Sequence, residues 1–272
     1  MIDRQRVKEE FASYTRNYNA EDVKIALKIA HTYRVADHCE QIAKSLDLSG
    51  EDVEFAWLSG MLHDIGRFEQ VTRYNTFIDS QSVDHAEFGA DLLFGNSSDS
   101  ENGAGADSGK GLIERFLDDK NLYEMLEIVI RQHNKYRIKE GLDERTLVFC
   151  NILRDADKVD ILRVNVESPM EEIYNVSCED LATCGVSEAV MEQVRKRIAV
   201  NRSVMTTAAE HLIGHIALNF ELVYKRSIEL AIEQGYIYKM FDFKTTNPTT
   251  KAALEETRKI LGEYLEEKGC RL

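Results

Sequence analysis

The chain is poor in proline, with two among 272 residues, Pro169 and Pro248. Because proline interrupts helices and marks turns, this scarcity favours long helices over a turn-rich β fold. The chain also lacks any apolar run near the roughly 20 residues that a membrane-spanning helix needs. Its first ten residues carry no apolar stretch of the kind found in a signal peptide. We therefore expect a helical protein without a membrane partner.

Positive charge is scarce as well, since 34 Lys and Arg residues face 48 Asp and Glu residues, for a formal net charge of −14. Binding to nucleic acid polymers or to anionic membranes depends on Lys and Arg to neutralise phosphates, so we expect neither partner. A small anionic substrate stays compatible if its site carries cations. The 5 cysteines are widely spaced without a C-x-x-C pair, which indicates a reduced, cytoplasmic protein and no thiolate zinc site.

Apolar residues recur at helical spacing through most of the chain. Helices are predicted over residues 20–46, 52–65, 82–94, 121–133, 143–164, 187–200, 206–234 and 249–267. The helix over 143–164 is apolar nearly all round, which predicts a central, buried position. The only segment that suggests a β-strand is 236–243. The sequence thus predicts an all-α protein.

The expected helix ends follow from capping patterns. Gly66 has the character of a left-handed cap at the end of helix 52–65, and Ser82 that of the N-cap of helix 82–94. Asn121 and Glu124 have the spacing of a capping box. Residues 95–111 are almost entirely Gly, Ser, Asn and Asp, so they are predicted to form a flexible surface loop inside a domain. We expect one domain over 1–165 and a helical extension over 166–272, packed on the same domain.

Histidine and aspartate residues gather near the ends of the predicted helices. His31 lies on the first helix, His63 and Asp64 end the second, His85 opens the third and His133 ends the fourth. A further aspartate, Asp157, lies in the segment D-A-D-K-V-D of the apolar helix 143–164. A buried carboxylate must be paired, hydrogen-bonded or bound to a metal. Helix ends allow side chains from several helices to converge on such a group.

This order of residues resembles the HD superfamily of metal-dependent phosphohydrolases, whose minimal signature is His…His-Asp…Asp. The surrounding sequence is similar too, with H-T-Y-R-V at residue 31, G-M-L-H-D before the pair at 63–64, H-A-E-F-G-A at 85, I-R-Q-H-N around 133 and D-A-D-K-V-D around 157. The resemblance covers about residues 20–165. It implies an HD-domain helical bundle, here followed by additional C-terminal helices.

With His85 and His133 included, the set of expected ligands resembles that of the six-ligand, binuclear members of that family. This resemblance implies that His31, His63, Asp64 and Asp157 hold one metal. His85 and His133 would hold the second, with Asp64 as a bridge between the two. Imidazole and carboxylate ligands suit Fe, Mn, Co, Ni or Zn, so two divalent transition metal ions are expected. Mononuclear members need only His, His-Asp and Asp, and that alternative stays open. The expected metal ligands are His31, His63, Asp64, His85, His133 and Asp157.

Cations near these ligands fit a phosphorylated substrate. Arg34 follows His31 by one helical turn, Arg67 follows Asp64 by three residues, and Lys158 is adjacent to Asp157 although neighbouring residues on a helix point apart. With Asp64 they form the expected catalytic set. Each arginine could instead form a salt bridge. Of the remaining histidines, His38 is interpreted as structural or as a neighbour of the metal ligands. His211 and His215 have i, i+4 spacing that could hold a metal, but no third ligand is evident.

The resemblance implies a hydrolase that cleaves a phosphate ester or anhydride of a nucleotide or similar small metabolite with a metal-bound hydroxide. The same six ligands also occur in di-iron HD-fold oxygenases, and a metal-containing binding module without turnover is a third alternative. No Gly-Tyr-Pro segment follows His133, which argues against cyclic di-GMP hydrolases, and the length leaves no room for a (p)ppGpp synthetase domain. The ligand order also resembles smaller HD proteins that cleave diadenosine polyphosphates. The helices after Asp160 either shape the pocket or form a homodimer interface.

Overall fold

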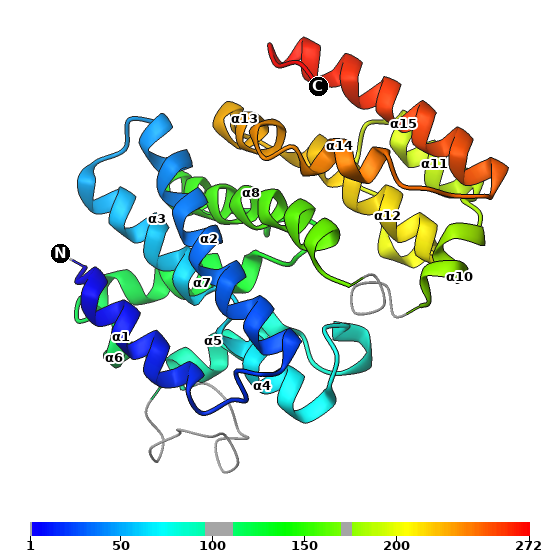
Figure 1. Cartoon of the computed structure of the whole chain (residues 1–272). Coiled ribbons are helices and arrows are strands. Elements are labelled where there is room, and N and C mark those ends of the chain that lie inside the picture. Colours follow the sequence, from blue (N-terminus) through cyan, green and yellow to red (C-terminus); the bar gives the residue numbers. More distant parts are fainter. Residues whose placement is uncertain (1, 96–110, 170–175) are drawn as a thin grey trace. The chain divides into compact units, whose positions relative to one another are not determined.

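The structure is a computed structural model that describes residues 2–95, 111–169 and 176–272 (Figure 1). These residues form helices and connecting turns and contain no strand, which confirms the predicted all-α fold. The chain divides into two compact units, Met1–Ala156 and Asp157–Leu272, with the division inside one continuous helix, α8 (Glu144–Glu167). The predicted loop over 95–111 lies outside the described residues except for its two end glycines.

The described residues of the first unit form seven helices and the first part of α8, with short 3₁₀ turns at Asp79–Gln81 and Lys120–Leu122. Helix α2 packs along α3, α4 packs on α5, and α5 packs on α7. No helix over the N-terminal residues was predicted, yet α1 buries an aromatic side of its surface against the rest of the unit. The seven helices are α1 (Arg4–Thr15), α2 (Val23–Ser45), α3 (Gly50–Leu62), α4 (Ile65–Tyr74), α5 (His85–Phe94), α6 (Ile113–Phe116) and α7 (Tyr123–Gln132).

Two glycines let the helices of this unit approach closely. A Cβ atom on Gly60 in α3 would stand 2.6 Å from the Cα atom of Ala36 in α2. A Cβ atom on Gly66 would stand 2.6 Å from the backbone oxygen of His85 and 2.7 Å from the backbone nitrogen of Gly89. The prediction that Gly66 caps the preceding helix is therefore wrong. It lies inside α4, where its missing side chain allows α4 and α5 to touch.

Two other predicted helix starts are wrong. Helix α5 begins after Asp84 and not after Ser82. The Asp84 carboxylate accepts hydrogen bonds from the backbone N–H groups of Ala86 and Glu87. Helix α7 begins at Tyr123 after a 3₁₀ turn, so Asn121 and Glu124 form no capping box. The predicted burial of helix 143–164 holds from Phe149 onward in α8. In both wrong predictions an aspartate is the capping residue: Asp84 caps α5, and Asp119 caps the 3₁₀ turn that precedes α7.

In the described part of the second unit, the last part of α8 is followed by six helices and by 3₁₀ turns at Arg202–Val204 and Leu218–Glu221. The single helix predicted over 206–234 is wrong, because the chain leaves the helical conformation after Ala217 and Leu222 is extended. The strand suggested for 236–243 is also wrong, because Tyr236–Phe241 form a helix that buries Ile237, Met240 and Phe241 at helical spacing. The helices are α10 (Cys178–Thr183), α11 (Glu188–Arg195), α12 (Ala208–Ala217), α13 (Lys225–Glu233), α14 (Tyr236–Phe241) and α15 (Pro248–Glu267).

Among the described residues, no helix has the combination of length and apolar character that crossing a bilayer requires.

Candidate metal centre

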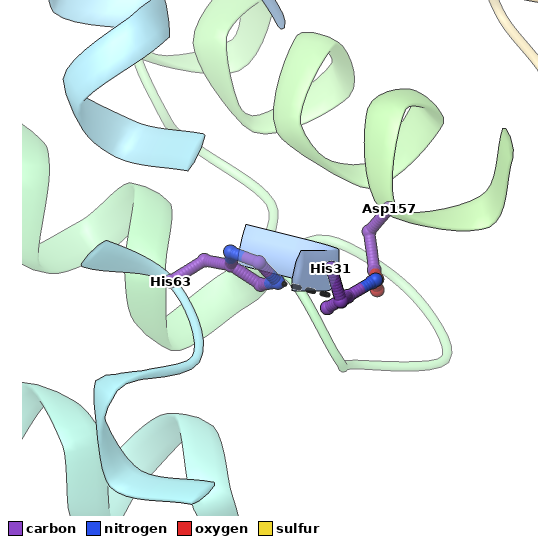
Figure 2. A group of neighbouring side chains, drawn as sticks. All are labelled: His31, His63 and Asp157. Carbon is purple, nitrogen blue, oxygen red and sulfur yellow. Dashed lines mark hydrogen bonds between the residues drawn. The ribbon is translucent and has the colours of Figure 1, made fainter. Parts of the chain in front are cut away.

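Two buried histidines from neighbouring helices face each other in the first unit. His31 lies in the middle of α2 and His63 directly follows α3. Their Nε2 atoms are 3.3 Å apart (Figure 2). The other ring nitrogen of His63, Nδ1, donates a hydrogen bond to the backbone oxygen of Gly60 at 2.8 Å. Because a carbonyl oxygen can only accept, Nδ1 carries a proton, and in the neutral form of the ring Nε2 presents its lone pair towards His31.

A second pair of histidines has the same arrangement. His85 opens α5 and His133 follows α7, and their Nε2 atoms are 3.0 Å apart. His133 Nδ1 donates to the backbone oxygen of Ile130 at 2.7 Å, and His85 Nδ1 lies 2.7 Å from the Asp79 carboxylate. In the neutral rings both Nε2 atoms therefore present lone pairs to each other. Two lone pairs at this distance repel unless a cation lies with them, so the donor set fits a metal ion.

Asp64 joins the two pairs. Its carboxylate is 2% exposed and lies in the two-residue link between α3 and α4. One oxygen, Oδ2, is 3.4 Å from Nε2 of both His31 and His63. The other oxygen, Oδ1, is 3.5 Å from Nε2 of His85 and 3.8 Å from Nε2 of His133. Each oxygen of this buried carboxylate thus faces its own pair of imidazole rings.

The sixth predicted ligand, Asp157, belongs to the same cluster. It is the first residue of the second unit, but it lies on α8, which continues without a break from the first unit. Ligand atoms of His31, His63 and Asp157 all lie within 4.8 Å of one another (Figure 2). The ligand atoms of His63, Asp64 and His133 form a second group of the same kind. Imidazole nitrogens and carboxylate oxygens in this mixture suit divalent transition metals.

Residues 29–162 match the HD domain family. The chain is an HD-domain protein. The match begins two residues before His31 and ends five residues after Asp157, so it includes the whole cluster. HD domains are typically metal-dependent phosphohydrolases that bind divalent metals. Comparisons with curated proteins and with solved structures return no match.

A lysine that the sequence analysis did not single out lies in the HD-domain cluster. Lys28 Nζ is 2.6 Å from Asp64 Oδ2, and the lysine side chain is 13% exposed. Burial by itself raises the pKa of Asp64, but the positive charge of Lys28 lowers it well below its usual range. Asp64 is therefore ionised. The signal that could have found Lys28 is its position one helical turn before His31, on the same face of α2.

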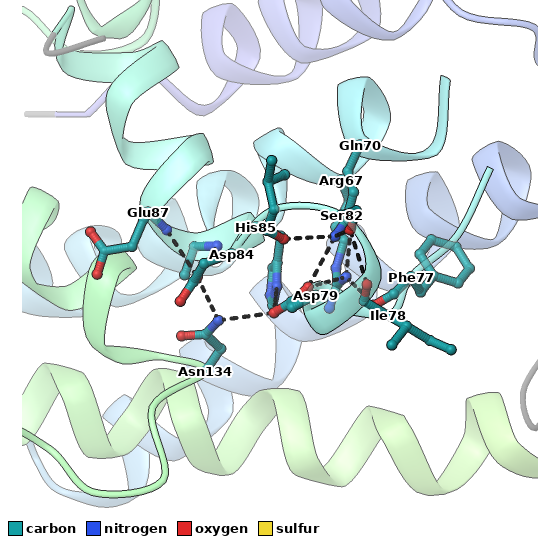
Figure 3. Close-up of polar contacts among 12 residues, drawn as sticks. Arg67, Gln70, Phe77, Ile78, Asp79, Ser82, Asp84, His85, Glu87 and Asn134 are labelled. Atoms are coloured by element: carbon teal, nitrogen blue, oxygen red, sulfur yellow. Dashed lines mark hydrogen bonds and ion pairs between the residues drawn. The ribbon is translucent and has the colours of Figure 1, made fainter. Parts of the chain in front are cut away.

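Arg67 joins Asp64 to the segment between α4 and α5. Its Nε atom is 3.6 Å from Asp64 Oδ1. Its Nη1 atom donates to the backbone oxygen of Phe77 at 2.7 Å, to Gln70 Oε1 at 2.6 Å and to Asp79 Oδ1 at 3.0 Å (Figure 3). These bonds fix the guanidinium within the protein. The predicted contact of Arg67 with substrate stays a prediction.

Asp79 is the second residue that the sequence analysis missed. Burial raises the pKa of Asp79, but the hydrogen bond from His85 and the charge of Arg67 lower it below its usual range. Burial, and then the charge of Arg67, lower the pKa of His85. The pair therefore consists of a neutral imidazole and an ionised carboxylate, and a neutral imidazole is the form that binds a metal. A carboxylate that orients a ligating histidine in this way also raises its basicity.

Arg154 holds the turn that carries His133. This arginine of α8 is 8% exposed and donates Nη1 to the backbone oxygens of Gln132 at 3.0 Å and His133 at 3.4 Å. It also donates to the backbone oxygen of Lys135. These oxygens lie at the C-terminal end of α7, where helix carbonyls have no partner within the helix. Arg154 thus satisfies them and fixes the position from which His133 reaches the cluster.

The remaining predicted residues lie as follows. Arg34 is half-buried on α2, and Lys158 forms an ion pair with Glu221 at 3.4 Å. Their predicted catalytic roles stay predictions. On α12, burial lowers the pKa of His215 to about 3, so that its ring is neutral. Within the described part of the chain, the groups of side chains able to hold a metal include neither His211 nor His215.

Proposed function

We propose that this HD-domain protein is a metal-dependent phosphohydrolase that uses two divalent transition metal ions to cleave a phosphate ester or anhydride in a nucleotide or similar small metabolite. One observation carries the proposal: two pairs of imidazole Nε2 atoms face a single buried, ionised carboxylate, Asp64, and each pair lies nearest to a different oxygen. A bridging carboxylate with a separate pair of imidazole ligands on each side suits two ions held close together.

The chemistry of such a centre is that of two adjacent cations, which activate a water molecule and neutralise the oxygens of a phosphoryl group. The protein's part is to keep the donor atoms ready. Asp64 stays ionised beside Lys28, and His85 stays neutral while it donates to Asp79. The formal net charge of −14 opposes the approach of an anion, so cations at the site must supply the attraction.

The first experiment measures metal content by mass spectrometry on protein purified without chelator or nickel resin. We expect about two metal ions per chain, removal of both by EDTA, and recovery on adding Mn, Co, Ni, Fe or Zn. Hydrolysis of phosphomonoesters, nucleotides and dinucleoside polyphosphates is then assayed with each metal, through released phosphate and through chromatography of the nucleotide products. The expected result is hydrolysis that disappears with EDTA and returns with metal.

Two outcomes would contradict the proposal. Iron-loaded protein that consumes O₂ with a substrate and releases no phosphate would assign the centre to an oxygenase. Protein that takes up no metal on reconstitution, yet binds phosphorylated ligands, would be a binding module.

The Asp79→Asn substitution tests the orienting role of Asp79. We expect it to weaken metal binding at the His85 and His133 pair by about 10- to 100-fold, because the ligating imidazole loses the carboxylate that fixes and polarises it. Metal binding at the His31 and His63 pair should change little. Equilibrium dialysis against a chelator buffer measures both affinities. Asp242→Asn, which makes the same change in a surface pair with Arg258, is the control. Equal weakening of both sites would contradict a role specific to His85.

A further inference from the structure

Lys28 places a positive charge beside Asp64, the carboxylate at the middle of the proposed metal centre. Its ammonium group lies 2.6 Å from Asp64 Oδ2, the same oxygen that His31 and His63 address at 3.4 Å. The ammonium also lies 5.3 Å from the centre of the Phe77 ring, within the range of a cation–π contact. Lys28 therefore acts as an internal counter-ion for the buried carboxylate.

A divalent cation held by these histidines would share Asp64 Oδ2 with the ammonium group of Lys28. Two like charges this close repel, and the repulsion is stronger in a buried site than in water. The conflict is relieved if the flexible lysine leaves Asp64, or if an anion joins the two cations. In a centre that binds a phosphorylated substrate, one phosphoryl group would do both. It would accept the ammonium group that leaves Asp64, and its negative charge would lie between the lysine and the metal ion.

We propose that Lys28 leaves Asp64 when the metal centre fills and binds a phosphoryl oxygen of the substrate, so that metal and phosphate bind cooperatively through this lysine. The inference rests on the proposed function. The other cation beside Asp64, Arg67, is held by the backbone oxygen of Phe77 and by Asp79. Lys28 has a four-carbon stem and a point charge that can turn from one oxygen to another.

The test titrates metal-free protein with Mn²⁺ by calorimetry, with and without inorganic phosphate. In the native protein, phosphate should raise the affinity for Mn²⁺ by about tenfold or more, within the usual range of coupling between two sites. In Lys28→Met, Mn²⁺ alone should bind several-fold more tightly, because no ammonium competes for Asp64, and the effect of phosphate should fall to about twofold or less.

Lys24→Met is the matched control. It removes the same charge from the same helix one turn earlier, where the ammonium group lies 3.4 Å from Asn75 Oδ1. This variant should behave as the native protein does. Lys28→Gln repeats the test with a polar side chain if the methionine variant does not fold, as judged by circular dichroism.

Each outcome separates this inference from the proposed function. If the native protein binds Mn²⁺ and the Lys28 variants keep its full response to phosphate, Lys28 does not bind the phosphoryl group and only this inference is lost. The same holds if phosphate has no effect on the native protein. If the native protein binds no metal, the proposed function fails first.

Discussion

Asp64→Asn should remove both metal ions and lower phosphate release by about 10³-fold or more. The amide keeps the volume of the side chain but loses the charge that both histidine pairs share. Each metal would lose the carboxylate placed between the pairs, since Oδ1 faces His85 and His133 while Oδ2 faces His31 and His63. Loss of this single residue should therefore affect both metals, whereas loss of any one histidine should affect one.

Metal content and phosphate release are measured together on the purified variant. Asp52→Asn is the matched control, because Asp52 lies in the same unit and forms a surface ion pair with Arg145 at 2.7 Å. That control should keep both metals and lose at most about 1 kcal/mol of stability. Full phosphate release by Asp64→Asn, or retention of two metals, would show that Asp64 is not the bridge.

The ligands could be predicted from the sequence because each lies beside a recognisable local pattern. His63 and Asp64 are adjacent, His85 and His133 fall near helix ends, and Asp157 lies in an apolar helix where a carboxylate is unusual. His31 lies within a helix and is followed by the segment T-Y-R-V. Their order along the chain then pointed to the family, which the domain match confirms. The pairing of the histidines on two oxygens could not be predicted, because it depends on how α2, α3, α5 and α7 pack.

The supporting residues were missed for the same reason. Lys28 and Asp64 are 36 residues apart, and Arg154 reaches His133 across 21 residues. A lysine or arginine in isolation is most often a surface residue, so its sequence position carries little information. Only the folded structure shows that the half-buried Lys28 lies against a carboxylate and that the buried Arg154 lies against helix-end carbonyls.

Errors in the predicted elements have local causes. Gly66 follows a helix and suggested an end, but close packing against His85 explains the glycine instead. The segment 236–243 is rich in aromatic residues, which favours a strand by propensity. Burial of Ile237, Met240 and Phe241 on one side selects the helix. Tertiary packing thus overrides local preference in both cases.

His133→Gln should separate a binuclear centre from a mononuclear one. His133 donates Nδ1 to Ile130 and directs Nε2 towards His85 and Asp64 Oδ1. Removing this imidazole should release one metal and leave about one per chain, held on the side of His31, His63 and Asp157. If both ions take part in hydrolysis, phosphate release should fall by about 100-fold or more.

The control is His211→Gln, because His211 is a half-buried histidine outside the cluster, and it should keep both metals and full phosphate release. A His133→Gln protein that keeps one metal and nearly full phosphate release would assign catalysis to a single ion. In that case the 3.0 Å approach of the His85 and His133 Nε2 atoms would need another cation between them. A proton shared by the two rings would serve, and the variant's phosphate release would then depend on pH differently from that of the native protein.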